Sequence, residues 1–136
     1  MSDDANDSLR LFLLEQVSSY EELEALLFLA QHEGRELTDA ELAAALRAPV
    51  DAIEEALRGL AGRRELVEVT QRAGIALYRY GPRDEAGRAR VEELRQAYAE
   101  RRLSVVRMMS SNAVERVRGA AMQRLADAFR IERGKK

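Results

Sequence analysis

The 136-residue sequence contains no cysteine, no tryptophan, two prolines and one histidine, His32. Without cysteine the chain has no disulfide, no thiolate metal ligand and no thiol nucleophile. A lone histidine provides no second imidazole for a metal site. His32 follows an apolar helical pattern, so we expect it to interact with the C-terminal end of that helix rather than to bind a metal or take part in catalysis.

The sequence also lacks a set of residues that would indicate catalysis. No glycine-rich phosphate loop is present, and the serine pairs at 18–19 and 110–111 stand at predicted helix boundaries, where capping accounts for them. Adjacent carboxylates such as Glu92 and Glu93 diverge on a helix and so do not form a catalytic pair. We therefore expect no enzymatic activity, no cofactor and no metal.

No apolar run approaches the roughly 18 residues that a membrane-spanning helix needs. The acidic start, MSDDAND, lacks the basic segment of a secretory signal. We expect a cytoplasmic protein with no membrane partner. A composition of 46% hydrophobic and 34% charged residues fits one ordinary domain with an appendage.

Charge is unevenly divided along the chain. Residues 1–62 hold 14 acidic and 4 basic residues, a net charge of −10, whereas residues 63–136 hold 10 and 18, a net charge of +8, which together give −2. Such an imbalance indicates either a polyanionic partner or a second copy of the chain packed acidic part to basic part.

The most informative stretch is residues 38–61, TDAELAAALRAPVDAIEEALRGLA. Thr38 and Glu41 have the spacing of a capping box, which predicts the start of a helix. Pro49 suits the first turn of a second helix, where a missing N–H does no harm. Two short helices joined by a tight turn are typical of a helix-turn-helix unit.

The second of these helices has two distinct faces. One is an apolar stripe spaced by three and four residues, formed by Val50, Ile53, Leu57 and Leu60. In a helix-turn-helix protein the other face often enters the DNA major groove. Here that face carries Asp51, Ala52, Glu55, Arg58 and Gly59, and is therefore acidic.

The flanking segments complete the pattern. Upstream, residues 8–17 predict a short packing helix after an acidic tail at residues 1–7, and Ser19 with Glu22 forms another capping box before a helix that stops near Gly34. Glu36-Leu37 could form a very short strand. Downstream, ELVEVT and IALYRY alternate as two strands joined by a four-residue link, residues 71–74. Val67 and Val69 share one strand face, and Ile75 and Leu77 share another.

The order helix, helix, helix, hairpin over residues 20–80 resembles the winged-helix domain of bacterial transcriptional regulators such as the MarR, ArsR and PadR families. The whole chain is also similar to an uncharacterised group of bacterial winged-helix proteins, in which a segment like SYEELEALL leads and one like ADAFRIERGKK closes. The predicted fold is mainly α with a small β-hairpin: a winged helix-turn-helix followed by two C-terminal helices. We divide the chain into a tail and packing helix (1–18), a winged-helix domain (19–81), a helical pair (84–131) and a basic tail (132–136).

The helical pair is predicted as one helix from residue 84 to residue 109, a break at Ser110-Ser111-Asn112, and a second helix capped by Asn112 and Glu115. Its apolar residues cannot be buried by the pair alone. They either mediate a homodimer, as flanking helices commonly do in similar regulators, or cover the winged helix of the same chain. The residues expected at a dimer interface are Val91, Leu94, Tyr98, Val105, Met108, Val114, Val117, Leu125 and Phe129.

For DNA binding we expect contacts from the arginines around the second helix: Arg47, Arg58, Arg63, Arg64 and Arg72. Asp51 and Glu55, next to Glu54, oppose it because they bring negative charge toward a polyanion. Two hypotheses therefore remain. The chain is a dimeric transcriptional regulator that binds double-stranded DNA, or it is a protein-interaction module whose acidic helix face binds a protein partner.

Overall fold

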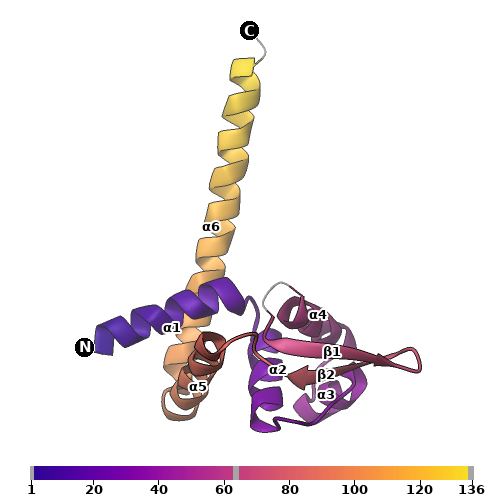
Figure 1. The fold of residues 1–136 in the computed structure, drawn as a ribbon. Helices are drawn as coiled ribbons and strands as arrows, with labels where there is room; N and C mark the ends of the chain where they lie inside the picture. The colour runs from indigo at the N-terminus through magenta and orange to yellow at the C-terminus, as the bar shows by residue number, and fades with distance from the viewer. Residues whose placement is uncertain (1, 63–64, 135–136) are drawn as a thin grey trace.

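The computed structural model describes the backbone of residues 2–62 and 65–134 and the side chains of residues 7–62 and 65–129. From the N-terminus the elements are α1 (Ser2–Gln16), α2 (Tyr20–Gln31), α3 (Asp39–Leu46), α4 (Val50–Ala61), β1 (Val67–Arg72), β2 (Ile75–Tyr80), α5 (Glu85–Glu100) and α6 (Arg102–Gly134). The predicted class, a helical protein with one hairpin and two C-terminal helices, is confirmed. We call α2, α3, α4 and the hairpin the body, and α1, α5 and α6 the arm (Figure 1).

The body forms around the apolar stripes that the sequence predicts. Ile53, Leu57 and Leu60 of α4 are fully buried, as are Leu23, Leu26 and Leu29 of α2. Val50, the first residue of the predicted α4 stripe, remains 44% exposed. Burying each large aliphatic side chain contributes roughly 1.5–3 kcal/mol, so these six residues fix α4 against α2 and leave its opposite face to solvent.

Local capping sets the starts of the body helices. The Ser19 hydroxyl accepts a hydrogen bond from the Glu22 N–H at 3.1 Å. At α3 both bonds of the capping box are present, from the Glu41 N–H to the Thr38 hydroxyl at 3.1 Å and from the Thr38 N–H to the Glu41 carboxylate at 3.0 Å. His32 follows α2, and its Nδ1 lies 2.9 Å from the Phe28 carbonyl oxygen, which agrees with the expected structural role.

The hairpin has a shorter turn than expected, and it buries the face that carries Tyr78 and Tyr80. Arg72 pairs with Ile75, so the loop is the two residues Ala73 and Gly74 rather than four. Both have positive φ, 52° and 78°, as in the type I′ turn that matches strand twist. Tyr78 and Tyr80 face the core, which leaves Ile75, on the other face, 55% exposed. Two aromatic side chains bury more apolar area than Ile75 and Leu77 would, and this decides the face.

Two helix boundaries in the arm also differ from the expectation. The chain turns at Arg101, and α6 continues through residues 110–112 without a break. Asn112 is 1% exposed, and its Nδ2 donates to the Arg10 carbonyl oxygen of α1 at 3.1 Å. This contact with a distant segment overrides the weak helix propensity of the Ser-Ser-Asn sequence. At the other end, α1 begins at Ser2, within the stretch expected to be a tail.

The arm packs around the first part of α6. Leu9, Phe12 and Leu13 of α1 are buried, together with Val91 and Leu94 of α5 and Val105 of α6, in the same core as the body. Beyond this region α6 extends away from the rest of the molecule, whereas the free end of the hairpin points in another direction, away from the arm (Figure 1). The hairpin tip and the outer part of α6 thus both project from the molecule, on different sides (Figure 1).

Candidate nucleic-acid interface

The solvent face of α4 carries the acidic residues that the sequence places there. Asp51 and Glu55 are exposed and Ala52 is half-buried. Glu54 and Arg58, one turn apart, form an ion pair at 3.6 Å with 45% and 68% of their side chains exposed. An exposed pair of this kind is worth only about 0.3–0.5 kcal/mol, so Arg58 is free to rotate toward another anion. The face of α4 remains negative in either case, because Asp51, Glu54 and Glu55 outnumber Arg58.

Arg47 lies in the turn between α3 and α4. It ends α3 with a left-handed backbone, φ 55°, and its side chain is exposed. The part of the chain that the structure describes offers it no ion pair. Arg47 is therefore a cation at the start of α4 that is available to an outside anion.

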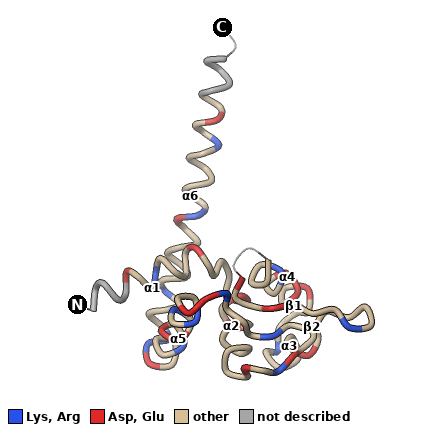
Figure 2. Tube along the Cα trace, viewed as in Figure 1, with Lys and Arg blue, Asp and Glu red and all other residues tan. Residues whose placement is uncertain are grey.

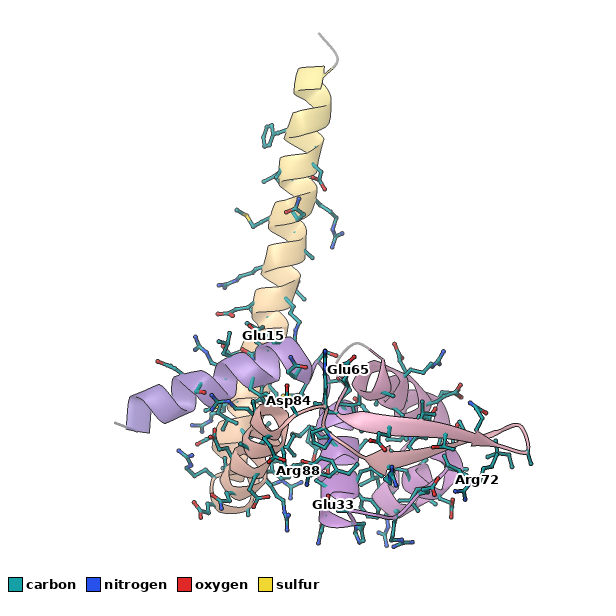
Figure 3. All side chains as sticks on the ribbon, viewed as in Figure 1. Glu15, Glu33, Glu65, Arg72, Asp84 and Arg88 are labelled. Atoms are coloured by element: carbon teal, nitrogen blue, oxygen red, sulfur yellow. The ribbon has the colours of Figure 1, made fainter. Side chains whose placement is uncertain are left out.

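Arg72 is the last residue of β1, next to the tip of the hairpin. Figure 3 places it near the free end, and Figure 2 shows positive charge there. Its Nη2 lies 3.1 Å from Glu36 Oε1, and 67% of its side chain is exposed. Arg72 thus lies at the hairpin tip, and its ion pair with Glu36 was not expected from the sequence. The other two predicted arginines, Arg63 and Arg64, lie outside the described residues.

Sequence reasoning missed how many body arginines have glutamate partners distant in sequence. Arg79 contacts Glu68 across the hairpin, and Arg83 lies 2.9 Å from Glu65. The Glu68 hydrogen bond and charge, with a smaller contribution from Glu36, raise the pKa of Arg79. The sequence alone does not give the register of the two strands. Once the register is known, Glu68 and Arg79 are cross-strand partners and lie on the same face. These pairs reduce the positive potential of the hairpin.

A second set of polar contacts fixes the body against the arm. Arg88 of α5 lies 2.9 Å from Glu33, after α2, and 5.3 Å above the Tyr80 ring, and Figure 3 shows Arg88 and Glu33 facing each other. The Tyr98 hydroxyl of α5 is 3.2 Å from that of Tyr20. Burial, followed by the Tyr20 hydrogen bond, raises the pKa of Tyr98. These contacts hold α5 on α2, and so set the direction in which the arm leaves the body.

The residues expected at a dimer interface divide into two groups. Val91, Leu94 and Val105 are at most 1% exposed in the single chain, and Tyr98 and Met108 are partly buried against its core. Their apolar side chains are thus covered by the chain itself. The remaining four are more than half exposed on the projecting part of α6: Val114, Val117, Leu125 and Phe129. Of the nine predicted residues, these four are the ones exposed enough to contact a second chain.

An open groove of about 460 Å³ lies where α1, the segment before β1 and the start of α5 meet. Leu11 and Phe12 line one wall, and Glu15, Glu65 and Asp84 stand around it (Figure 3). Asp84 is occupied in capping α5, since it accepts from the Gly87 N–H at 2.8 Å.

Among the described residues, no group of three or more His, Asp or Glu side chains is arranged to hold a metal ion.

None of the helices in the described ranges combines the length and apolar character needed to cross a bilayer. The sequence matches no protein-family model and no curated protein.

Solved structures, in contrast, resemble the chain over most of its length. MepR, a transcription regulator of the Staphylococcus aureus multidrug efflux pump MepA, gives a TM-score of 0.52 at 20% identity, over 93% of this chain and 92% of that one. A MepR–DNA complex gives 0.52 at 18% identity, over 88% and 92%. Reduced HlyU from Vibrio cholerae N16961 gives 0.51 at 23% identity, over 71% and 96%. At these identities the likeness concerns the fold, and it shows that this chain has the winged-helix fold.

Proposed function

We propose that this chain is a transcriptional regulator that binds double-stranded DNA as a homodimer. The observation that carries the proposal is the arrangement of the body. The second helix of the helix-turn-helix is buried along one side and open along the other, and a hairpin with an arginine at its tip projects beside it. A helix and a hairpin exposed in this way are the elements that winged-helix proteins present to a groove and to the adjacent backbone.

The distribution of charge decides which residues make the contacts. Arg47 and Arg72 can reach phosphates, and Arg58 can do so by leaving its weak pair with Glu54. Asp51 or Glu55 can accept a hydrogen bond from a cytosine amino group, but every further carboxylate on this face is repelled by DNA. The arginines around α4 therefore supply the affinity, and α4 itself supplies little.

The similarity to MepR supports this proposal, because a MepR–DNA complex matches over 88% of the present chain. The matched length includes more than a winged-helix domain alone would require. The match therefore extends beyond the body into the arm. A role for the arm in dimer assembly fits the proposed regulator.

The projecting part of α6 supports the dimer. From residue 113 to residue 129 every residue except Arg116 is exposed, and Val114, Val117, Leu125 and Phe129 recur along it. In the single chain these four apolar side chains remain exposed to water, which is unfavourable. Covering them with the same helix of a second chain would bury apolar surface on both copies, and two-fold dimers are the commonest assemblies.

The acidic face of α4 favours the second candidate function, a protein-interaction module. Asp51 and Glu55 are exposed, and Arg58 of α4 and Arg72 at the hairpin tip are paired within the chain. Such a surface attracts a basic protein more readily than it attracts DNA.

Fluorescence anisotropy with a labelled random duplex, at low and at moderate salt, separates the two functions. For a regulator, affinity falls steeply as salt rises, and Arg72→Ala lowers the slope of log K against log salt by about 0.9, the value for one lost phosphate contact. Asp51→Ala combined with Glu55→Ala strengthens nonspecific binding. No binding at low salt by any of these proteins would leave the interaction module as the better explanation.

Sedimentation equilibrium of the full chain tests the dimer. Combining Val117→Asp with Leu125→Asp places charges on the exposed α6 surface and should convert a dimer into a monomer. Leu103→Asp is the matched control, because Leu103 is also on α6 and is 72% exposed but lies near the body. A wild-type chain that remains monomeric at high concentration would refute the dimer.

A further inference from the structure

The outward face of the hairpin carries two arginines, and each contacts a glutamate. Side chains alternate between the faces of a strand and cross-strand partners share a face. Glu68, Arg72 and Arg79 therefore lie together, on the face opposite the buried Tyr78. The partner of Arg79 is Glu68 on the neighbouring strand. The partner of Arg72 comes from outside the hairpin.

This partner, Glu36, is held in place by its neighbour. The Leu37 N–H donates to the Tyr78 carbonyl oxygen at 2.9 Å, and the Tyr78 N–H donates to the Leu37 carbonyl oxygen at 2.8 Å. Leu37 thus forms a short bridge to β2, and Glu36 cannot leave the hairpin unless these bonds break. The Glu36 side chain is 26% exposed and that of Arg72 is 67% exposed. The carboxylate is the fixed member of the pair and the guanidinium the mobile one.

A DNA phosphate must compete with this fixed carboxylate. When Arg72 turns toward a phosphate it gives up the 3.1 Å contact with Glu36. The carboxylate then remains beside the hairpin without its partner, close to the negative backbone of the DNA. Both effects lower the net gain from the Arg72 contact.

We propose that Glu36 is a positioning residue that limits the affinity of this chain for DNA by holding Arg72 in an intramolecular ion pair. This inference rests on the proposed DNA binding. Glu36→Gln should tighten binding to a random duplex by about two- to fivefold at low salt, the range expected from an exposed ion pair. It should also steepen the salt dependence, by up to about 0.9 in slope if Arg72 gains a full phosphate contact.

A double-mutant cycle tests whether Glu36 acts through Arg72. Wild type, Glu36→Gln, Arg72→Gln and the double variant are titrated into the same labelled duplex at two salt concentrations. If Arg72 mediates the effect, most of the gain from Glu36→Gln disappears in the Arg72→Gln background. Glu68→Gln is the matched control, since it removes a carboxylate from the same hairpin face and frees Arg79 instead, and its effect should be independent of Arg72.

The outcomes distinguish this inference from the function on which it rests. An equal gain with and without Arg72 would overturn the inference, because Glu36 would then act only by its charge. It would also be overturned if Glu36→Gln left both affinity and salt slope unchanged while Arg72→Gln weakened binding. Absence of binding by all four proteins at low salt would instead refute the DNA-binding function itself.

Discussion

Arg116 of α6 closes the C-terminal end of α1, and its replacement by alanine should destabilise the protein. The guanidinium donates to four backbone carbonyl oxygens: Leu14 at 2.7 Å, Leu13 at 3.1 Å, and Val17 and Ser18 at 3.2 Å each. The last turn of α1 has no basic residue of its own. Arg116 therefore supplies, from 98 or more residues away in the sequence, the positive charge that a helix C-terminus favours.

The size of the effect follows from these contacts. A cation at a partly buried helix C-terminus contributes up to about 2 kcal/mol, and a single hydrogen bond to a charged group about 1.5–3 kcal/mol. One guanidinium cannot deliver four such bonds additively, and the freed carbonyl groups regain some water because the site is half-buried. We expect Arg116→Ala to lower the free energy of unfolding by about 2 kcal/mol, equivalent to roughly 6–10 °C in a chain of this size.

Urea denaturation followed by circular dichroism measures this loss, at one protein concentration so that dimerisation does not change the comparison. Arg118→Ala is the control, because Arg118 is exposed on the same helix and its loss should cost less than about 0.5 kcal/mol. Arg116→Lys should recover only part of the stability, since one ammonium group cannot span four carbonyls. Equal stabilities of the Arg116→Ala and Arg118→Ala variants would refute the reasoning.

Two further predictions concern local structure. Ala73→Asn should raise the free energy of unfolding by about 0.5–1 kcal/mol, and with it the urea midpoint. Asparagine tolerates the positive φ of this position, and Asn-Gly is the favoured pair for such a turn. A lower midpoint would contradict the assigned turn. The backbone hydrogen bond from Thr38, followed by that from its side chain, lowers the pKa of Glu41 from 4.5. The ionised carboxylate therefore stabilises the fold above pH 4.5, and this contribution is lost as pH falls through the lowered pKa. The stability difference between wild type and Glu41→Gln should shrink as the solution is acidified, and a difference that does not change with pH would show that ionisation of Glu41 is unimportant.

The body could be predicted from the sequence because its signals are local. The cap at Ser19, the capping box at Thr38 and the proline before α4 act within one helical turn. The structure contains all three, although at Ser19 only the hydroxyl takes part, because the Glu22 carboxylate accepts from the Ser18 N–H instead. The apolar residues of α4 are also spaced by three and four, which is itself a local signal of a helix. The acidic face opposite it then follows from geometry alone.

The break between α5 and α6 and the ion pairs between distant residues could not be predicted in this way. Asn112 looks like a helix cap until the carbonyl of Arg10, 102 residues away, is placed beside it. Similarly, Glu36 and Arg72 are 36 residues apart, and only the bridge at Leu37 brings them together. The sequence thus identified the positions of the arginines expected to bind DNA. It could not show which of them are already paired with a carboxylate, because the partners are distant in the sequence.

The unbroken course of α6 has a consequence for changes in its length. Its 33 residues extend about 50 Å, and successive residues of a helix are rotated by about 100°. Because no loop separates the part held on α1 by Asn112 and Arg116 from the part that carries Leu125 and Phe129, the azimuth of the exposed stripe is fixed relative to α1. One inserted residue would turn that stripe to another side of the helix, whereas seven, close to two whole turns, would restore its phase. Substitutions along α6 can therefore be tolerated at many positions at which a single insertion or deletion cannot.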